Sequence, residues 1–117
     1  MYKIKIKNEF MHGAIWVCDE DGISINYELI DNDEELQELN KKTEELFDSY
    51  YEFDSHEQPV RFNAELEKTT RREMLDFIIK IKKRLSDIND GSFIVEDTES
   101  ERLSKLAKWL NRDSNFY

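Results

Sequence analysis

The longest helical pattern in the sequence lies between Asn63 and Gly91. Its apolar positions recur every three or four residues and are Met74, Ile78, Ile81, Leu85 and Ile88. This spacing places them on one face of a helix. Asn63 or Thr70 can cap its start, and Thr70 has Glu73 three residues on, as in a capping box. Gly91 ends it. The rest of the chain has to pack against this apolar face.

Four short segments predict strands. Residues 2–7 alternate strictly between apolar side chains and lysines, which is typical of a half-buried strand. Residues 14–18 and 23–30 predict two more strands, joined by a tight loop in which Gly22 can supply a positive φ. Three consecutive strands with short connections predict an antiparallel meander. Residues 91–97 predict a fourth, short strand.

Two further helices complete the expected fold. Asp31, Asn32 and Asp33 offer N-caps for a helix from about Asp33 to Tyr51. Thr98–Glu101 has the spacing of a capping box and opens a last helix through Leu110. The expected class is α+β: a small antiparallel sheet, made of the three-strand meander and the late strand, packed against two long helices and a C-terminal helix. We expect a single domain over residues 1–117.

The composition favours a folded protein of the cytoplasm. Hydrophobic and charged residues each make up 38% of the 117 residues, and aromatic residues make up 12%, which argues against disorder. Cys18 is the only cysteine, so an internal disulfide is excluded. We find no export signal and no apolar run long enough for a membrane span. With a pI near 4.7, the chain should be repelled by nucleic acid and anionic lipid.

The negative charge is concentrated in one segment. Residues 19–57 contain 15 acidic and 2 basic residues and so carry a net charge of −13, compared with −10 for the whole chain. The remainder of the chain is therefore slightly cationic. A localised negative field of this kind points to a cationic partner.

Within this segment, a row of carboxylates should line the exposed face of the predicted helix. At 100° per residue, the row comprises Glu34, Glu38, Glu45, Asp48 and Glu52, with Lys41 as its one cation. Like charges four residues apart disfavour a helix. Tyrosines beside acids are also typical of recognition surfaces. The candidate partner-binding residues are Glu34, Glu38, Glu45, Asp48, Tyr51, Glu52, Phe53 and Asp54. The alternative is a solvated face that maintains solubility.

No pattern in the sequence indicates catalysis, a metal or a cofactor. Glycines are not grouped as in a phosphate loop, and His12 and His56 lack the spacing of a zinc site. Cys18 falls in a predicted strand, where a buried, inert thiol is expected. Asp19, Asp21, Gly22 and Glu28 match part of a calcium loop, but Val17 stands at its first ligand position, so a hairpin loop is the better interpretation. We expect no cofactor, no metal and no enzymatic activity.

The layout resembles a known family. Gly22, the LIDNDEEL stretch and the segment from Phe93 to Leu103 are similar in arrangement to the bacterial immunity proteins of contact-dependent growth inhibition and related polymorphic toxin systems. The resemblance implies a small cytoplasmic protein that binds one cognate toxin domain, often a basic nuclease, and blocks its active site or substrate groove. We expect a monomer or weak dimer that contacts neither nucleic acid nor membrane.

Two other functions remain open from the sequence. One is a nucleic-acid mimic that inhibits a DNA- or RNA-binding enzyme, in which the acidic segment imitates phosphates. The other is a small hydrolase that uses a pair of carboxylates, a pattern that can be drawn in any chain this acidic. For the immunity protein, charge reversal at Glu38, Glu45 and Asp48 should slow association with the toxin in a salt-dependent way. The mimic should instead bind several unrelated nucleic-acid enzymes or a nuclease complex, and the hydrolase should lose turnover on a single Asp or Glu change.

Overall fold

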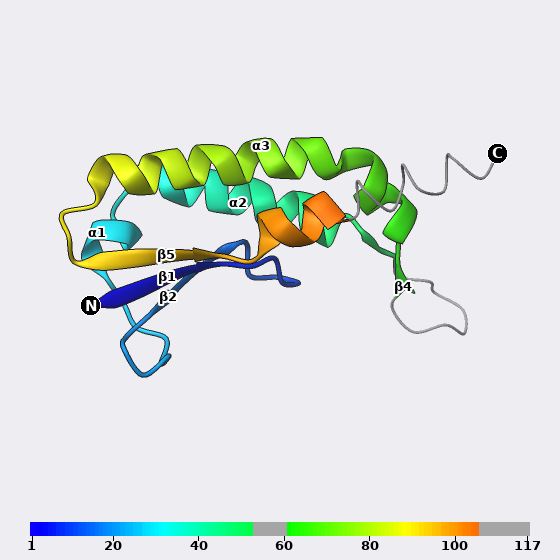
Figure 1. The fold of residues 1–117 in the computed structure, drawn as a ribbon. Helices are drawn as coiled ribbons and strands as arrows, with labels where there is room; N and C mark the ends of the chain where they lie inside the picture. The colour runs from blue at the N-terminus through cyan, green and yellow to red at the C-terminus, as the bar shows by residue number, and fades with distance from the viewer. Residues whose placement is uncertain (53–60, 106–117) are drawn as a thin grey trace.

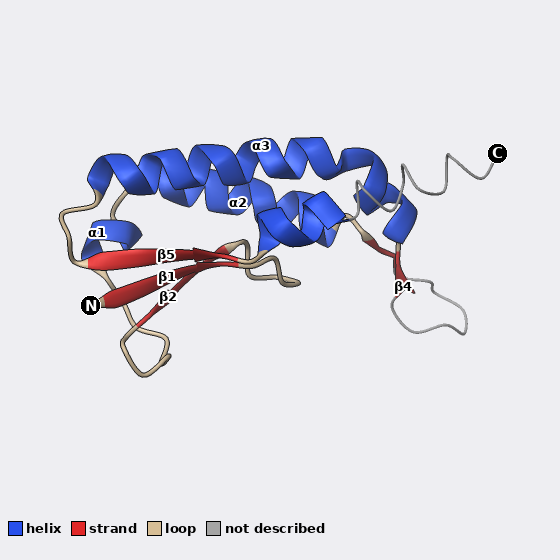
Figure 2. Cartoon of the chain, viewed as in Figure 1, coloured by secondary structure: helices blue, strands red, loops and turns tan. Residues whose placement is uncertain are grey.

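The computed structural model describes residues 1–52 and 61–105. In chain order the elements are β1 (Tyr2–Ile6), β2 (Ile15–Cys18), α1 (Glu28–Asp31), α2 (Glu34–Asp48), β3 (Tyr51–Glu52), β4 (Arg61–Phe62), α3 (Ala64–Ile88) and β5 (Phe93–Asp97). Residues 99–105 form a further helix. The expected α+β class is confirmed: α2 and α3 pack against each other and cover one face of a small sheet (Figures 1 and 2).

The sheet has the strand order β2-β1-β5, with β1 in the centre. β1 pairs antiparallel with β2, so that Ile4 lies opposite Val17, and pairs parallel with β5, so that Ile4 also lies opposite Val95. The prediction of a purely antiparallel sheet is therefore wrong. Parallel neighbours need a long crossover, and here the helices between β2 and β5 supply it.

The prediction of a third strand at residues 23–30 is also wrong. Only Ser24 forms a bridge, with Cys18, and the chain then turns into α1. The Asp31 carboxylate accepts the backbone N–H of Tyr27 at 2.9 Å, and the Ile30 N–H bonds to the Tyr27 carbonyl. These local hydrogen bonds satisfy the backbone within the turn, so the alternating pattern does not produce a strand. The tight loop before it was predicted correctly, since Gly22 has φ +83°.

Both long helices begin at side-chain caps. The Asp33 carboxylate accepts the Leu36 N–H and the Asn63 amide oxygen accepts the Leu66 N–H, each at 2.9 Å. Asn63, rather than Thr70, therefore begins the second long helix. α2 ends at Asp48, three residues before the predicted Tyr51. Arg84 of α3 donates to Asp33 at 2.7 Å and so ties the start of α2 to the last turns of α3.

One apolar core joins the sheet to the helices. Its fully buried members include Ile4, Ile6, Leu36, Ile78, Ile81, Leu85, Phe93 and Leu103. Most positions that the two periodicities placed inside the protein are therefore in the core. Tyr2 is an exception at 38% exposed, and Ile88 is only partly buried.

The last helix begins differently from the prediction. The Asp97 carboxylate accepts the N–H groups of Glu99 and Ser100 at 3.0 Å, while the Thr98 hydroxyl donates to the Ile6 carbonyl. Asp97, and not a capping box at Thr98–Glu101, therefore starts this helix. The predicted stretch from Leu106 to Leu110 lies outside the described residues.

Among the described helices, none is both long and apolar enough to cross a membrane.

Candidate functional site

The carboxylates predicted on α2 do face solvent along most of the helix. Leu36, Leu39, Thr43 and Phe47 turn toward the core, and Glu34, Glu38 and Glu45 are exposed on the opposite side. This arrangement follows from helical geometry, because residues three and four apart share a face. α2 therefore presents three of the five predicted carboxylates as one exposed row, here called the acidic row: Glu34, Glu38 and Glu45.

Ion pairing reduces the free charge of this row. Lys42 approaches Glu38 to 3.6 Å, one turn away on the same helix. Neither Glu34 nor Glu45 has an ion-pair partner among the residues that the structure describes. Within the acidic row, these two side chains therefore carry negative charge that no described residue neutralises.

Asp48 and Glu52 were predicted to lie on the exposed row of the helix, but both carboxylates accept hydrogen bonds from other segments of the chain. α2 stops at Asp48, whose half-buried carboxylate accepts the backbone N–H of Met11 at 2.8 Å. Glu52 lies in β3, where its carboxylate accepts from the Asn63 side chain at 2.8 Å. Glu52 is therefore not on the helical row, and both carboxylates hold neighbouring loops. Phe53 and Asp54, the other two candidates beyond α2, lie outside the described residues.

Tyr51 belongs to a cluster of aromatic rings at the C-terminal end of α2. Its ring centroid lies 4.5 Å from that of Phe10, 5.7 Å from Phe47 and 5.1 Å from Phe62. We call Phe10, Phe47, Tyr50, Tyr51 and Phe62 the aromatic cluster. Tyr51 is half-buried in it, and Phe62 remains 37% exposed. The sequence indicated the tyrosines but not Phe10, which joins them only through the fold.

Beside the aromatic cluster, the chain from Asn8 to Gly13 forms a loop between β1 and β2. Met11 has φ +63°, in the left-handed region, and its side chain is 71% exposed. Holding a residue with a side chain in this region costs about 1–3 kcal/mol. Within the loop, the His12 ring stacks on Trp16 of β2, with the two ring centroids 3.5 Å apart. We call residues 8–13 the Met11 loop.

A shallow groove runs between α2 and α3 next to the acidic row. It has a volume of about 420 Å³ and is lined by Lys42, Glu45, Leu46, Ser49, Glu73 and Phe77. Glu45 thus belongs both to the acidic row and to a concave surface with an apolar lining. A partner side chain that combines a methylene stem with a cationic end, as lysine and arginine do, matches this lining.

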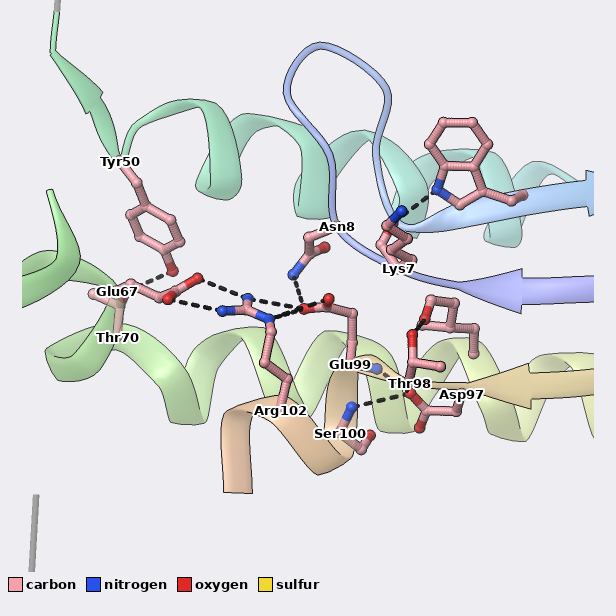
Figure 3. A network of polar contacts seen from close by, with 12 residues as sticks. Lys7, Asn8, Tyr50, Glu67, Thr70, Asp97, Thr98, Glu99, Ser100 and Arg102 are labelled. Carbon is pink, nitrogen blue, oxygen red and sulfur yellow. Dashed lines mark hydrogen bonds and ion pairs between the residues drawn. The ribbon is translucent and has the colours of Figure 1, made fainter. Parts of the chain in front are cut away.

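A buried ionic network lies on the other side of α3. No pattern in the sequence predicts this network. Arg102 donates to both oxygens of Glu67, at 3.0 and 2.8 Å, and to Glu99 at 2.9 Å (Figure 3). Asn8 donates to Glu99 at 3.0 Å. Glu67 and Glu99 are each only 4% exposed. Hydrogen bonds from Arg102 to Glu67 and Glu99 raise the pKa of the guanidinium, despite its partial burial. The network fastens the last helix to α3 and to the end of β1.

The described residues hold no group of three or more His, Cys, Asp or Glu side chains placed to bind a metal ion. In the loop that partly matched a calcium site, Asp19 accepts the N–H groups of Asp21 and Ile23, each at 2.9 Å. This carboxylate therefore closes a turn. Cys18 is buried, as expected.

No family model, no curated protein and no solved structure matches this chain.

Proposed function

We propose that this chain is an immunity protein that binds and neutralises a cognate basic toxin domain, of the nuclease type. The observation that carries the proposal is the combination of free negative charge along α2 with a partly exposed aromatic cluster at its C-terminal end, where Phe62 of β4 is 37% exposed. Glu34 and Glu45 are exposed and unpaired among the described residues, and the same helix ends in the aromatic cluster. Interfaces commonly combine aromatic anchors with a charged rim.

The two parts of this surface would act at different stages of binding. The carboxylates of α2 attract the cationic groups with which a nuclease holds phosphates, and so raise the association rate. Aromatic and apolar side chains then exclude water from the contact and slow dissociation. Occupation of the phosphate-binding groove would block the toxin without any reaction.

The experiment uses the C-terminal domain of the protein encoded directly upstream, because an immunity gene normally follows its toxin gene. Association is measured by stopped flow at two salt concentrations with wild type and with the double variant Glu34→Lys/Glu45→Lys. We expect this variant to associate about tenfold more slowly at low salt, with a smaller difference at high salt.

The matched control is Asp21→Lys/Asp76→Lys, which changes the net charge equally at exposed residues outside α2. Equal slowing by both variants would contradict a role for α2 beyond net charge. Wild type that fails to bind the upstream domain, but inhibits several unrelated DNA- or RNA-processing enzymes, would favour the nucleic-acid mimic instead.

A further inference from the structure

Hydrogen bonds of Met11 and of its neighbours hold the backbone at this position, while the side chain is exposed. The Asp48 carboxylate accepts the Met11 N–H at 2.8 Å, and the His12 N–H bonds to the Glu9 carbonyl at 3.2 Å. The side chain is 71% exposed, so it contributes little to the core. The left-handed backbone of Met11 is one that residues with a Cβ normally avoid.

α2 also holds the chain directly after the Met11 loop. The Ala14 N–H donates to the Thr43 hydroxyl at 3.1 Å, and the Ile15 N–H donates to the Asn40 amide oxygen at 2.9 Å. At Gly13 a Cβ would lie 2.6 Å from Asn40, so the chain passes α2 as closely as a glycine allows. Fixing the backbone that presents a side chain before binding lowers the entropy lost on binding.

The surroundings of Met11 define the partner surface that would fit it. Phe10 contacts Tyr51 in the aromatic cluster, and Phe62 is 37% exposed. Two carboxylates lie beside Met11: Glu9, which is exposed and two residues before it, and Asp48, which accepts its N–H. An apolar tip flanked by negative charge is complementary to an apolar pocket flanked by lysine or arginine.

We infer that Met11 is the central apolar anchor of the interface and inserts into a pocket, ringed by basic side chains, on the toxin domain. This inference rests on the proposed function, since it takes the toxin as the basic partner. The free protein accepts a strained backbone at Met11 because the bound state uses the side chain that this backbone presents.

The test is Met11→Gly, which removes the side chain and suits the left-handed backbone. The control is Ile79→Ala, which truncates a comparably exposed side chain (60%) on α3. We expect Met11→Gly to raise the thermal midpoint of the free protein by about 3 °C. We also expect it to dissociate about 30-fold faster from the purified upstream toxin domain in biolayer interferometry. Ile79→Ala should dissociate like wild type.

Three results would overturn the inference. A dissociation rate for Met11→Gly within twofold of wild type would show that the side chain is not an anchor. A lowered thermal midpoint would show that Met11 stabilises the free protein instead. Wild-type dimers in sedimentation that Met11→Gly abolishes would identify a second copy as the occupant. If wild type binds the toxin domain, these results overturn the Met11 inference alone. If wild type fails to bind, both the inference and the proposed function are overturned.

Discussion

The acidic row of α2 and the Arg102 network both consist of glutamates, but the two regions place them in opposite environments. In the network, Glu67 and Glu99 are buried and both bind Arg102. In the acidic row, Glu34 and Glu45 are exposed and have no ion-pair partner among the described residues. Buried carboxylates need partners because desolvation of an unpaired charge is costly. The unpaired, solvated carboxylates have no such structural task and remain available to another molecule.

Removing the guanidinium is the strongest test of this comparison. Arg102→Met leaves two buried carboxylates without their cation, so we expect the free energy of unfolding to fall by about 3 kcal/mol. The measurement is urea denaturation followed by circular dichroism. Lys105→Met is the control on the same helix, because Lys105 and its partner Glu101 are both exposed, and it should change stability by less than about 0.5 kcal/mol. Equal effects of the two variants would remove the distinction between buried and exposed pairs.

Asp33 pairs with the partly exposed Arg84 and so lies between the buried network and the exposed row. Its contribution to stability can be tested by changing the pH. The hydrogen bond from Arg84 holds the pKa of this carboxylate below its usual range. A carboxylate whose pKa is lower in the folded state than in the unfolded state stabilises the fold at pH values above its unfolded pKa, which is near 4. This stabilisation is lost as the pH falls through the folded pKa. Between pH 6 and pH 3, wild type should therefore lose about 1 kcal/mol more stability than Asp33→Asn, which keeps an N-cap. Parallel pH profiles of the two proteins would contradict this.

The smallest effect on stability is expected in the acidic row itself. Glu34→Gln and Glu45→Gln should each change the free energy of unfolding by less than about 0.5 kcal/mol, because neither side chain has an ion-pair partner within residues 1–52 and 61–105. Urea denaturation at low salt measures this. A loss above about 1 kcal/mol in either variant would show a structural role that the fold does not reveal, and would weaken the contrast with Glu67.

The helices could be predicted because their signals are local. The spacing of Ile78, Ile81 and Leu85 and the caps at Asp33 and Asn63 operate within a few residues. The parallel pairing of β1 with β5 could not be predicted, because strand alternation shows which face of a strand is buried but not which strand lies beside it. The error at residues 23–30 has a local cause, namely the hydrogen bond from Tyr27 to Asp31.

The candidate site was predicted in part for the same reason. The exposure of Glu34, Glu38 and Glu45 follows from helical periodicity. Met11 could not be found this way, because methionine is not a residue that indicates a left-handed backbone. Arg102 could not be found either, since its contact with Glu67 spans 35 residues of sequence.

The central position of β1 has a consequence for the order of folding. Its parallel neighbour β5 is synthesised more than 80 residues later, after both long helices. Contacts this distant in sequence close slowly. During synthesis β1 therefore has only β2 beside it, and the edge that β5 will cover stays open. A newly made chain cannot complete its sheet, or seat Phe93 in the core, until residues 93–97 have left the ribosome.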